Sequence, residues 1–160
     1  MKKPASSSKP NPAHGPDDRY ERAWMAREFK AVAGVDEVGR GPLAGPVVAA
    51  AVILDLSAVP AGLDDSKALN ARKRDLLYPQ IMAQARAVSV ASVPAGVIDR
   101  INIRQATLRA MALALAGLSA KPDAMLVDGR DLPAFPIEGE AVIGGDAKVL
   151  SIAAASIIAK

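Results

Sequence analysis

Residues 31–54 constrain the fold of this chain more than any other segment. They contain two apolar runs, 31–36 and 47–54, and the second has β-branched residues at both ends, as buried strands do. A stretch rich in Gly and Pro, residues 39–46, separates the two runs and is typical of a turn. Two apolar strands joined by such a turn predict an antiparallel pair.

Helical and strand patterns alternate along the rest of the chain. Helices are expected at 17–30, 70–86, 97–118 and from 151 onward, and further strands at 87–93, 124–127 and 141–143. Asn70 is a good N-cap for the second helix, whereas Pro79 predicts a kink or an early end. Its apolar face would carry Leu76, Leu77, Ile81 and Met82. The last helix is apolar on nearly every side and should be buried. This order predicts an α/β domain, a mixed sheet with helices on both faces.

Composition narrows the chemistry that the chain can perform. Its 160 residues include no Cys and one His, His14, which excludes thiolate zinc sites, Cys nucleophiles and most His-based triads. The longest apolar run, 47–54, is far shorter than the roughly 18 residues of a membrane span. The amino terminus is basic but has no apolar stretch behind it, so it is not a secretory signal. We therefore expect a cytoplasmic protein without a membrane segment.

The basic character of the chain belongs to its amino-terminal extension. Residues 1–30 carry the whole net charge of +3, and residues 31–160 are neutral overall. Residues 1–16 contain four Pro and three Ser but no Val, Ile, Leu or Phe. This composition predicts a disordered tail at 1–16, followed by one domain at 17–160.

Three acidic residues follow apolar strands: Asp36 and Glu37 after the first, and Asp128 after the fourth. Sites in open α/β sheets gather at the carboxyl ends of strands. Carboxylates that converge there repel one another unless a cation such as Mg²⁺ or Mn²⁺ lies between them. Strand alternation sends Asp36 and Glu37 to opposite faces, so both serve one site only if the strand ends or twists there. The alternative is that these acids simply begin loops.

Two further segments offer groups for an anionic ligand. Gly39, Arg40 and Gly41 place a guanidinium and open backbone beside the acids, although a tight turn with a solvated Arg is the simpler interpretation. Ser66 and Lys67, with the basic residues at 72–74, could contact phosphates; alternatively they form a turn and a solvated helix face.

Several segments, in order along the chain, closely resemble bacterial ribonuclease HII. They are residues 33–54, 65–67, 101–103 leading into 106–107, 127–129, and 145–147 with 152–160. The resemblance implies a ribonuclease H-like fold and an endonuclease that cuts RNA paired with DNA or ribonucleotides embedded in duplex DNA. It also implies a divalent cation, Mn²⁺ or Mg²⁺, and a monomer.

The same resemblance assigns roles to the candidate residues. Asp36, Glu37 and Asp128 match three of the family's metal-binding, catalytic carboxylates. Gly39, Arg40 and Gly41 match its motif that senses the ribose 2′-hydroxyl, the group that distinguishes RNA from DNA. Ser66 and Lys67 would bind substrate.

The resemblance also implies a departure at the end of the chain. The family is expected to have a fourth acidic residue a few positions after the segment that matches 152–160, then further helices, whereas this chain ends at Lys160. We therefore expect a C-terminally incomplete domain with impaired turnover, unless another acid such as Asp146 substitutes. The alternative is a catalytically dead remnant that still binds nucleic acid.

Overall fold

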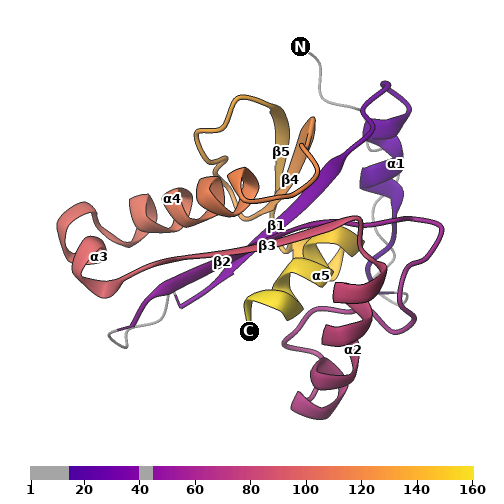
Figure 1. Cartoon of the computed structure of the whole chain (residues 1–160), viewed down its shortest axis with the longest axis horizontal. Helices are drawn as coiled ribbons and strands as arrows, with labels where there is room; N and C mark the ends of the chain where they lie inside the picture. The colour runs from indigo at the N-terminus through magenta and orange to yellow at the C-terminus, as the bar shows by residue number, and fades with distance from the viewer. Residues whose placement is uncertain (1–14, 40–44) are drawn as a thin grey trace.

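The computed structural model describes residues 15–39 and 45–160, which form a mixed five-stranded sheet with helices on both faces (Figure 1). In chain order the elements are α1 (Arg19–Met25), β1 (Val32–Val38), β2 (Val47–Ile53), α2 (Ala71–Gln84), β3 (Ala87–Val93), α3 (Ala95–Ile101), α4 (Ile103–Ala116), β4 (Ala124–Asp128), β5 (Glu138–Val142), the short 3₁₀ turn η1 (Gly145–Ala147) and α5 (Leu150–Ala159). The strand order is β3-β2-β1-β4-β5. β1 pairs antiparallel with β2, as predicted, and parallel with β4, so the sheet is mixed.

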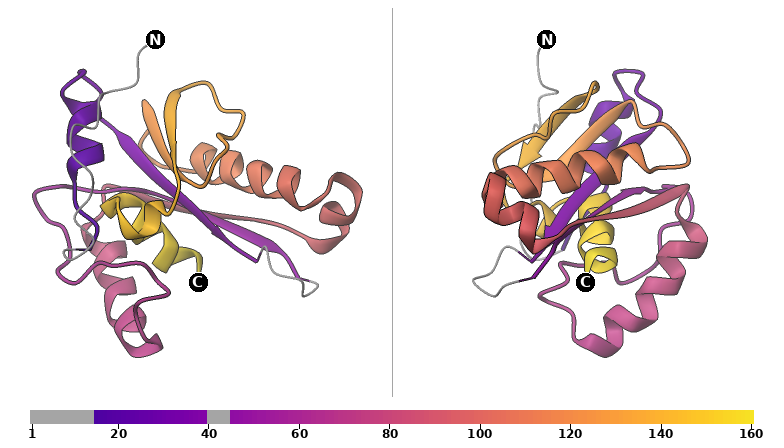
Figure 2. Two further views of the ribbon diagram at one scale, coloured as in Figure 1. Left: turned by 180° about the vertical axis from the view of Figure 1, so that it is seen from behind. Right: turned by 60° about the vertical axis from the view of Figure 1, so that its left-hand side comes forward.

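The two faces of the sheet are covered by different helices (Figure 2). α4 lies over one face, where Val35, Ala49 and Met111 belong to a common buried cluster. α5 lies on the other face and packs against α2, with Val52 and Ile157 in a second cluster. All residues of α5 from Ser151 to Ala159 are buried, which confirms the prediction made from their sequence.

The helix expected at 97–118 is in fact two helices, α3 and α4. Asn102 separates them because its backbone, with φ of 71° and ψ of 165°, departs from the helical conformation and ends α3. The Asn102 side chain then accepts a hydrogen bond from the Gln105 N–H at 3.0 Å and so caps α4. The apolar spacing of the sequence continues across Asn102 and conceals the break.

The predictions for α1 and α2 need smaller corrections. α1 ends at Met25, well before residue 30, and Glu28 has a left-handed φ of 72°. α2 has the predicted cap, since the Asn70 side chain accepts from the Lys73 N–H at 2.8 Å, and it continues through Pro79 without ending. Its apolar face is narrower than expected: Leu77 and Ile81 are buried, but Leu76 and Met82 are 60% and 49% exposed.

β5 begins at Glu138, whereas the sequence predicted a strand at 141–143. It is an edge strand in parallel pairing with β4, and four of its five residues are only partly buried. Such a strand has no continuous apolar run by which to recognise it.

The amino-terminal end of the described chain is attached to the start of α5. The Asp17 carbonyl accepts from the Leu150 N–H at 3.1 Å, and the Asp17 N–H donates to the Lys148 carbonyl at 3.2 Å. The predicted disordered tail lies, up to residue 14, outside the described residues. Among the helices that are described, none has the length and apolar character needed to cross a bilayer.

Candidate functional site

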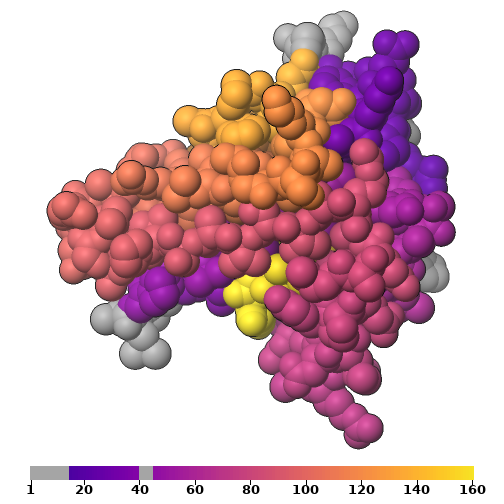
Figure 3. Space-filling model, in the orientation of Figure 1, coloured from indigo at the N-terminus to yellow at the C-terminus, as the bar shows by residue number. Residues whose placement is uncertain are grey.

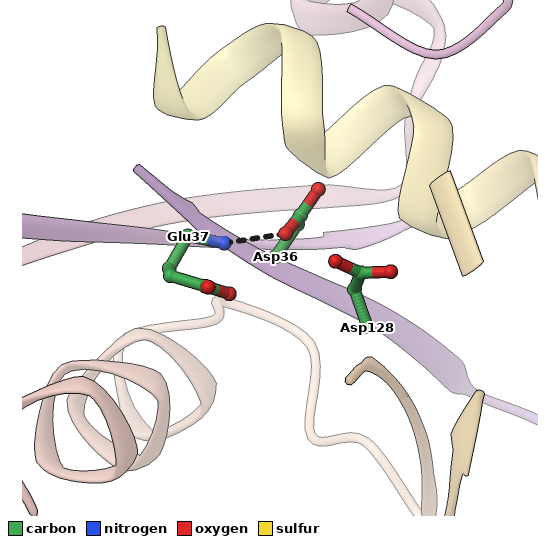
Figure 4. A group of neighbouring side chains, drawn as sticks. All are labelled: Asp36, Glu37 and Asp128. Atoms are coloured by element: carbon green, nitrogen blue, oxygen red, sulfur yellow. Dashed lines mark hydrogen bonds between the residues drawn. The ribbon is translucent and has the colours of Figure 1, made fainter. Parts of the chain in front are cut away.

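The pairing of β1 with β4 brings the predicted acids together. Val35 of β1 pairs with Val127 of β4 in parallel register, so the next residues, Asp36 and Asp128, lie side by side. One oxygen from each of Asp36, Glu37 and Asp128 lies within 4.8 Å of the others (Figure 4). The structure thus gathers the three carboxylates that the sequence placed after two strands.

Asp36 and Glu37 reach this cluster from opposite sides of β1. Gly34, two residues before Asp36, faces α5, whereas Val35, two before Glu37, belongs to the cluster under α4. Figure 4 shows the two side chains leaving the strand in different directions. Both serve one site because they lie near the end of β1, beside the end of β4.

Asp36 is the most buried acid of the cluster, with 5% of its surface exposed. Burial, together with the charges of Asp128 and Glu37, raises the pKa of Asp36 to about 10. The Glu37 N–H donates to its Oδ1 atom at 2.8 Å, which opposes part of this shift. Asp36 therefore holds a proton at neutral pH unless a cation takes its place.

A fourth acid that the site assignment had left out, Asp146, joins this group. It lies in η1, immediately after β5, and its N–H donates to Asp128 Oδ1 at 3.4 Å. Burial, the charge of Asp128 and a side-chain hydrogen bond with Asp65 raise the pKa of Asp146 to about 6. Asp146, which we named as a possible substitute for the expected fourth acid, thus lies beside the three clustered carboxylates and lines the same cavity. The signal was the one used for Asp128: an acid just after a strand at the same edge of the sheet.

The acids line a cavity of about 210 Å³. Its lining consists of Asp36, Glu37, Val38, Ser66, Lys67, Asp128, Asp146, Ser156 and Lys160. α5, in yellow, is visible in a recess beside α2 on the surface (Figure 3). The cavity thus joins the strand ends, the loop before α2 and one side of α5.

The structure places some of the predicted substrate-binding residues at the cavity and does not describe others. Ser66 and Lys67 line the cavity, and Lys67 Nζ lies 3.6 Å from Asp146 Oδ2. Gly39 lies at the end of β1 with φ of 99°, and a Cβ atom there would come within 2.4 Å of the Pro46 carbonyl oxygen. Glycine is therefore required at position 39. Arg40 and Gly41 lie outside the described residues.

The donor set fits a hard divalent cation. The clustered atoms are all carboxylate oxygens, the ligands preferred by Mg²⁺ and Mn²⁺. Burial and, second to it, the charges of Asp128 and Glu37 raise the pKa of Asp36, so a nearby cation would favour its charged form. Asp36, Glu37 and Asp128 could hold one ion, and Asp146 extends the same acidic surface.

A mixed sheet with acids at adjoining strand ends and helices on both faces defines a ribonuclease H-like protein. Ribonuclease H2 from Pyrococcus horikoshii has a similar structure, with a TM-score of 0.71 and 29% identity over 81% of this chain and 70% of that chain. The family model for ribonuclease HII matches residues 33–160, and the chain belongs to that family.

Further relatives agree with this membership. Ribonuclease HII of Brucella canis is 55% identical over 146 residues, which are 91% of this chain and 66% of that protein. The chain thus spans just under two thirds of the length of this curated relative. Bst-RNase HIII, whose structure was solved in complex with Mn²⁺, is 25% identical with a TM-score of 0.56, over 86% of this chain and 53% of that chain. The family resemblance and the fold class expected from the sequence are both confirmed.

Proposed function

We propose that this protein is an endonuclease that hydrolyses the RNA strand of RNA–DNA hybrids and cuts at ribonucleotides embedded in duplex DNA. The observation that carries the proposal is the meeting of Asp36, Glu37 and Asp128 within 4.8 Å, in a member of the ribonuclease HII family. Because its substrates contain DNA, the protein would act in the cytoplasm of a bacterial cell.

Asp36, Glu37 and Asp128 are proposed as the catalytic, metal-binding residues, with Asp146 beside them. A bound divalent cation, Mn²⁺ or Mg²⁺, would activate water and stabilise the leaving oxygen at phosphorus. The Mn²⁺ complex of Bst-RNase HIII supports the assignment to a divalent cation. The carboxylates of this chain would fix the position of the cation and keep it at the strand ends.

Substrate recognition is proposed for two further segments, residues 66–67 and residues 39–41. Lys67, whose side chain is 75% exposed at the rim of the cavity, would contact a phosphate, with Ser66 beside it. Gly39, Arg40 and Gly41 would recognise the ribose 2′-hydroxyl, as the family resemblance implies.

The test is a DNA duplex that contains one ribonucleotide, incubated with the protein and Mn²⁺ or Mg²⁺. We expect cleavage at the ribonucleotide, no cleavage of the all-DNA duplex, and loss of cleavage in Asp128→Asn. Equal cutting of both duplexes would instead indicate a general phosphodiesterase. Salt-dependent binding without cleavage under either metal would indicate a nucleic-acid-binding protein and would overturn the proposal.

A further inference from the structure

The structure assigns to Arg74 the role of a positioning residue: it holds the loop at 65–69 so that Asp65 and Lys67 contact Asp146 at the edge of the acidic cavity. This inference rests on the proposed function, because the loop matters only if the cavity is the active site. Arg74 lies in α2 and does not itself line that cavity.

The Arg74 side chain binds backbone carbonyl groups of the loop and not an acidic side chain. Its Nη1 atom donates to the Ser66 carbonyl at 3.0 Å and to the Leu69 carbonyl at 2.7 Å. One guanidinium nitrogen therefore joins two carbonyls on either side of Lys67 and Ala68. Both bonds are partly buried, so water replaces them poorly when the side chain is removed.

A second contact holds the same loop from the opposite side. The Ser66 N–H donates to the Ser156 hydroxyl of α5 at 3.3 Å, and that hydroxyl donates to the Ala153 carbonyl at 2.8 Å. Ser66 is thus fixed at its N–H by α5 and at its carbonyl by Arg74 of α2. Only 3% of Ser66 is exposed, which is consistent with a fixed structural position.

The loop held in this way acts on Asp146 through two side chains. Lys67 Nζ lies 3.6 Å from Asp146 Oδ2, and Asp65 lies beside the same carboxyl group, close enough to raise its pKa. The Asp65 carboxylate also accepts from the Lys67 N–H at 2.8 Å, so the two contacts depend on one loop conformation. Without Arg74, the loop would lose the constraint that keeps both groups on Asp146.

The neighbouring Arg72 offers a matched control. It carries the same charge in the first turn of the same helix, but it is exposed, whereas Arg74 is half-buried. Arg72→Ala removes a positive charge near the loop without removing either carbonyl contact. Arg74→Lys keeps the charge but has a shorter, non-forked head group, so it should hold the two carbonyls less well.

The experiment measures three quantities on wild type, Arg74→Ala, Arg74→Lys and Arg72→Ala: amide hydrogen exchange of residues 65–69, Mn²⁺ affinity by calorimetry, and kcat and KM on the single-ribonucleotide duplex. Thermal unfolding verifies that each variant is folded at the assay temperature. For Arg74→Ala we expect faster exchange in the loop, and Mn²⁺ affinity and kcat lowered about tenfold, the lower end of the range for residues that orient metal ligands. Arg74→Lys should lie between Arg74→Ala and wild type.

The outcomes separate this inference from the proposed function. Loop exchange and Mn²⁺ affinity should stay at the wild-type level in Arg72→Ala and change in Arg74→Ala. If both measurements behave in this way but the wild-type protein cleaves no substrate, the proposed nuclease activity is rejected and the positioning role of Arg74 is kept. Equal behaviour of Arg74→Ala and Arg72→Ala in both measurements would overturn the role of Arg74. If Arg74→Ala does not fold, Arg74→Lys decides: wild-type loop exchange and Mn²⁺ affinity in that variant would overturn the inference.

Discussion

Asp36 combines an unfavourable effect on the stability of the metal-free protein with a position in the proposed metal site. It is buried beside Asp128 and Glu37, and these surroundings raise its pKa to about 10. In the absence of a cation, the folded protein must take up a proton that the unfolded chain does not hold at neutral pH. A neutral side chain of the same shape avoids this cost.

Asp36→Asn should therefore make the metal-free protein more stable while abolishing its activity. We expect the free energy of unfolding at pH 7 in EDTA to rise by about 1 kcal/mol or more, and cleavage to fall by about a hundredfold or more. Urea denaturation and the single-ribonucleotide assay measure the two effects. Asp99→Asn, which changes an exposed acid in α3, is the control and should leave both unchanged. A loss of stability in Asp36→Asn would contradict this account.

At the scale of elements, the sequence predicted features that depend on local pattern and missed those that depend on contacts. β3 was predicted at its observed bounds, and α5 was correctly expected to be buried. The break at Asn102 was missed because the helical spacing of apolar residues continues on both sides of it, and a single Asn does not interrupt that pattern. Asp146 was named only as a possible substitute because its distance from Asp128 depends on the parallel pairing of β5 with β4, which the local sequence pattern does not reveal.

The contact between β1 and α5 leaves no room for a side chain at Gly34. A Cβ atom there would lie 2.2 Å from the Ser151 carbonyl carbon and 2.5 Å from the Ile152 nitrogen. Gly34→Ala must therefore displace α5 from the sheet, and we expect a loss of about 3 kcal/mol or more, or failure to fold. Gly96→Ala is the control, because nothing lies within 4 Å of its Cβ position in α3. That variant should be neutral or slightly stabilising in urea denaturation; equal stability of the two variants would refute the close packing.

The contact between α1 and α5 contains a buried acid, Glu21, with 2% of its surface exposed. Neither of its carboxyl oxygens receives a hydrogen bond of normal length from the described residues. Burial raises the pKa of Glu21 from 4.5 to about 8, so the folded protein holds a proton there that the unfolded chain releases. The stability associated with this proton is complete below pH 4.5 and is lost as the pH rises to about 8.

Glu21→Gln should remove this pH dependence. The variant minus wild-type difference in free energy of unfolding should increase by up to about 1.4 kcal/mol per pH unit between pH 4.5 and pH 8, in favour of the variant. Urea denaturation at several pH values measures the difference, with Glu28→Gln, which changes an exposed acid after α1, as the control. A difference that stays constant across this range would show that Glu21 is charged in the folded protein.

At the scale of the whole molecule, an acidic centre forms in a domain without net charge. Residues 31–160 are neutral overall, yet Asp36, Glu37, Asp128 and Asp146 meet at one cavity because β1, β4 and β5 are parallel and end at the same edge. The topology, and not the composition, thus concentrates the negative charge. A divalent cation bound there would stabilise the folded chain, since the unfolded chain does not bring these carboxylates together.

Mn²⁺ should therefore raise the melting temperature of protein stripped with EDTA. At a free concentration one hundred times its Kd, a ligand that binds only the folded state stabilises it by about 2.7 kcal/mol. For a chain of this size that corresponds to a rise of roughly 5–10 °C. NaCl at the same ionic strength should give a much smaller rise, because screening weakens repulsion without bridging the carboxylates. Asp128→Asn should lose most of the Mn²⁺ effect, because it removes one of the three clustered carboxylates that would hold the cation. An equal rise with NaCl, or an undiminished rise in Asp128→Asn, would mean that the cation binds elsewhere or only screens charge.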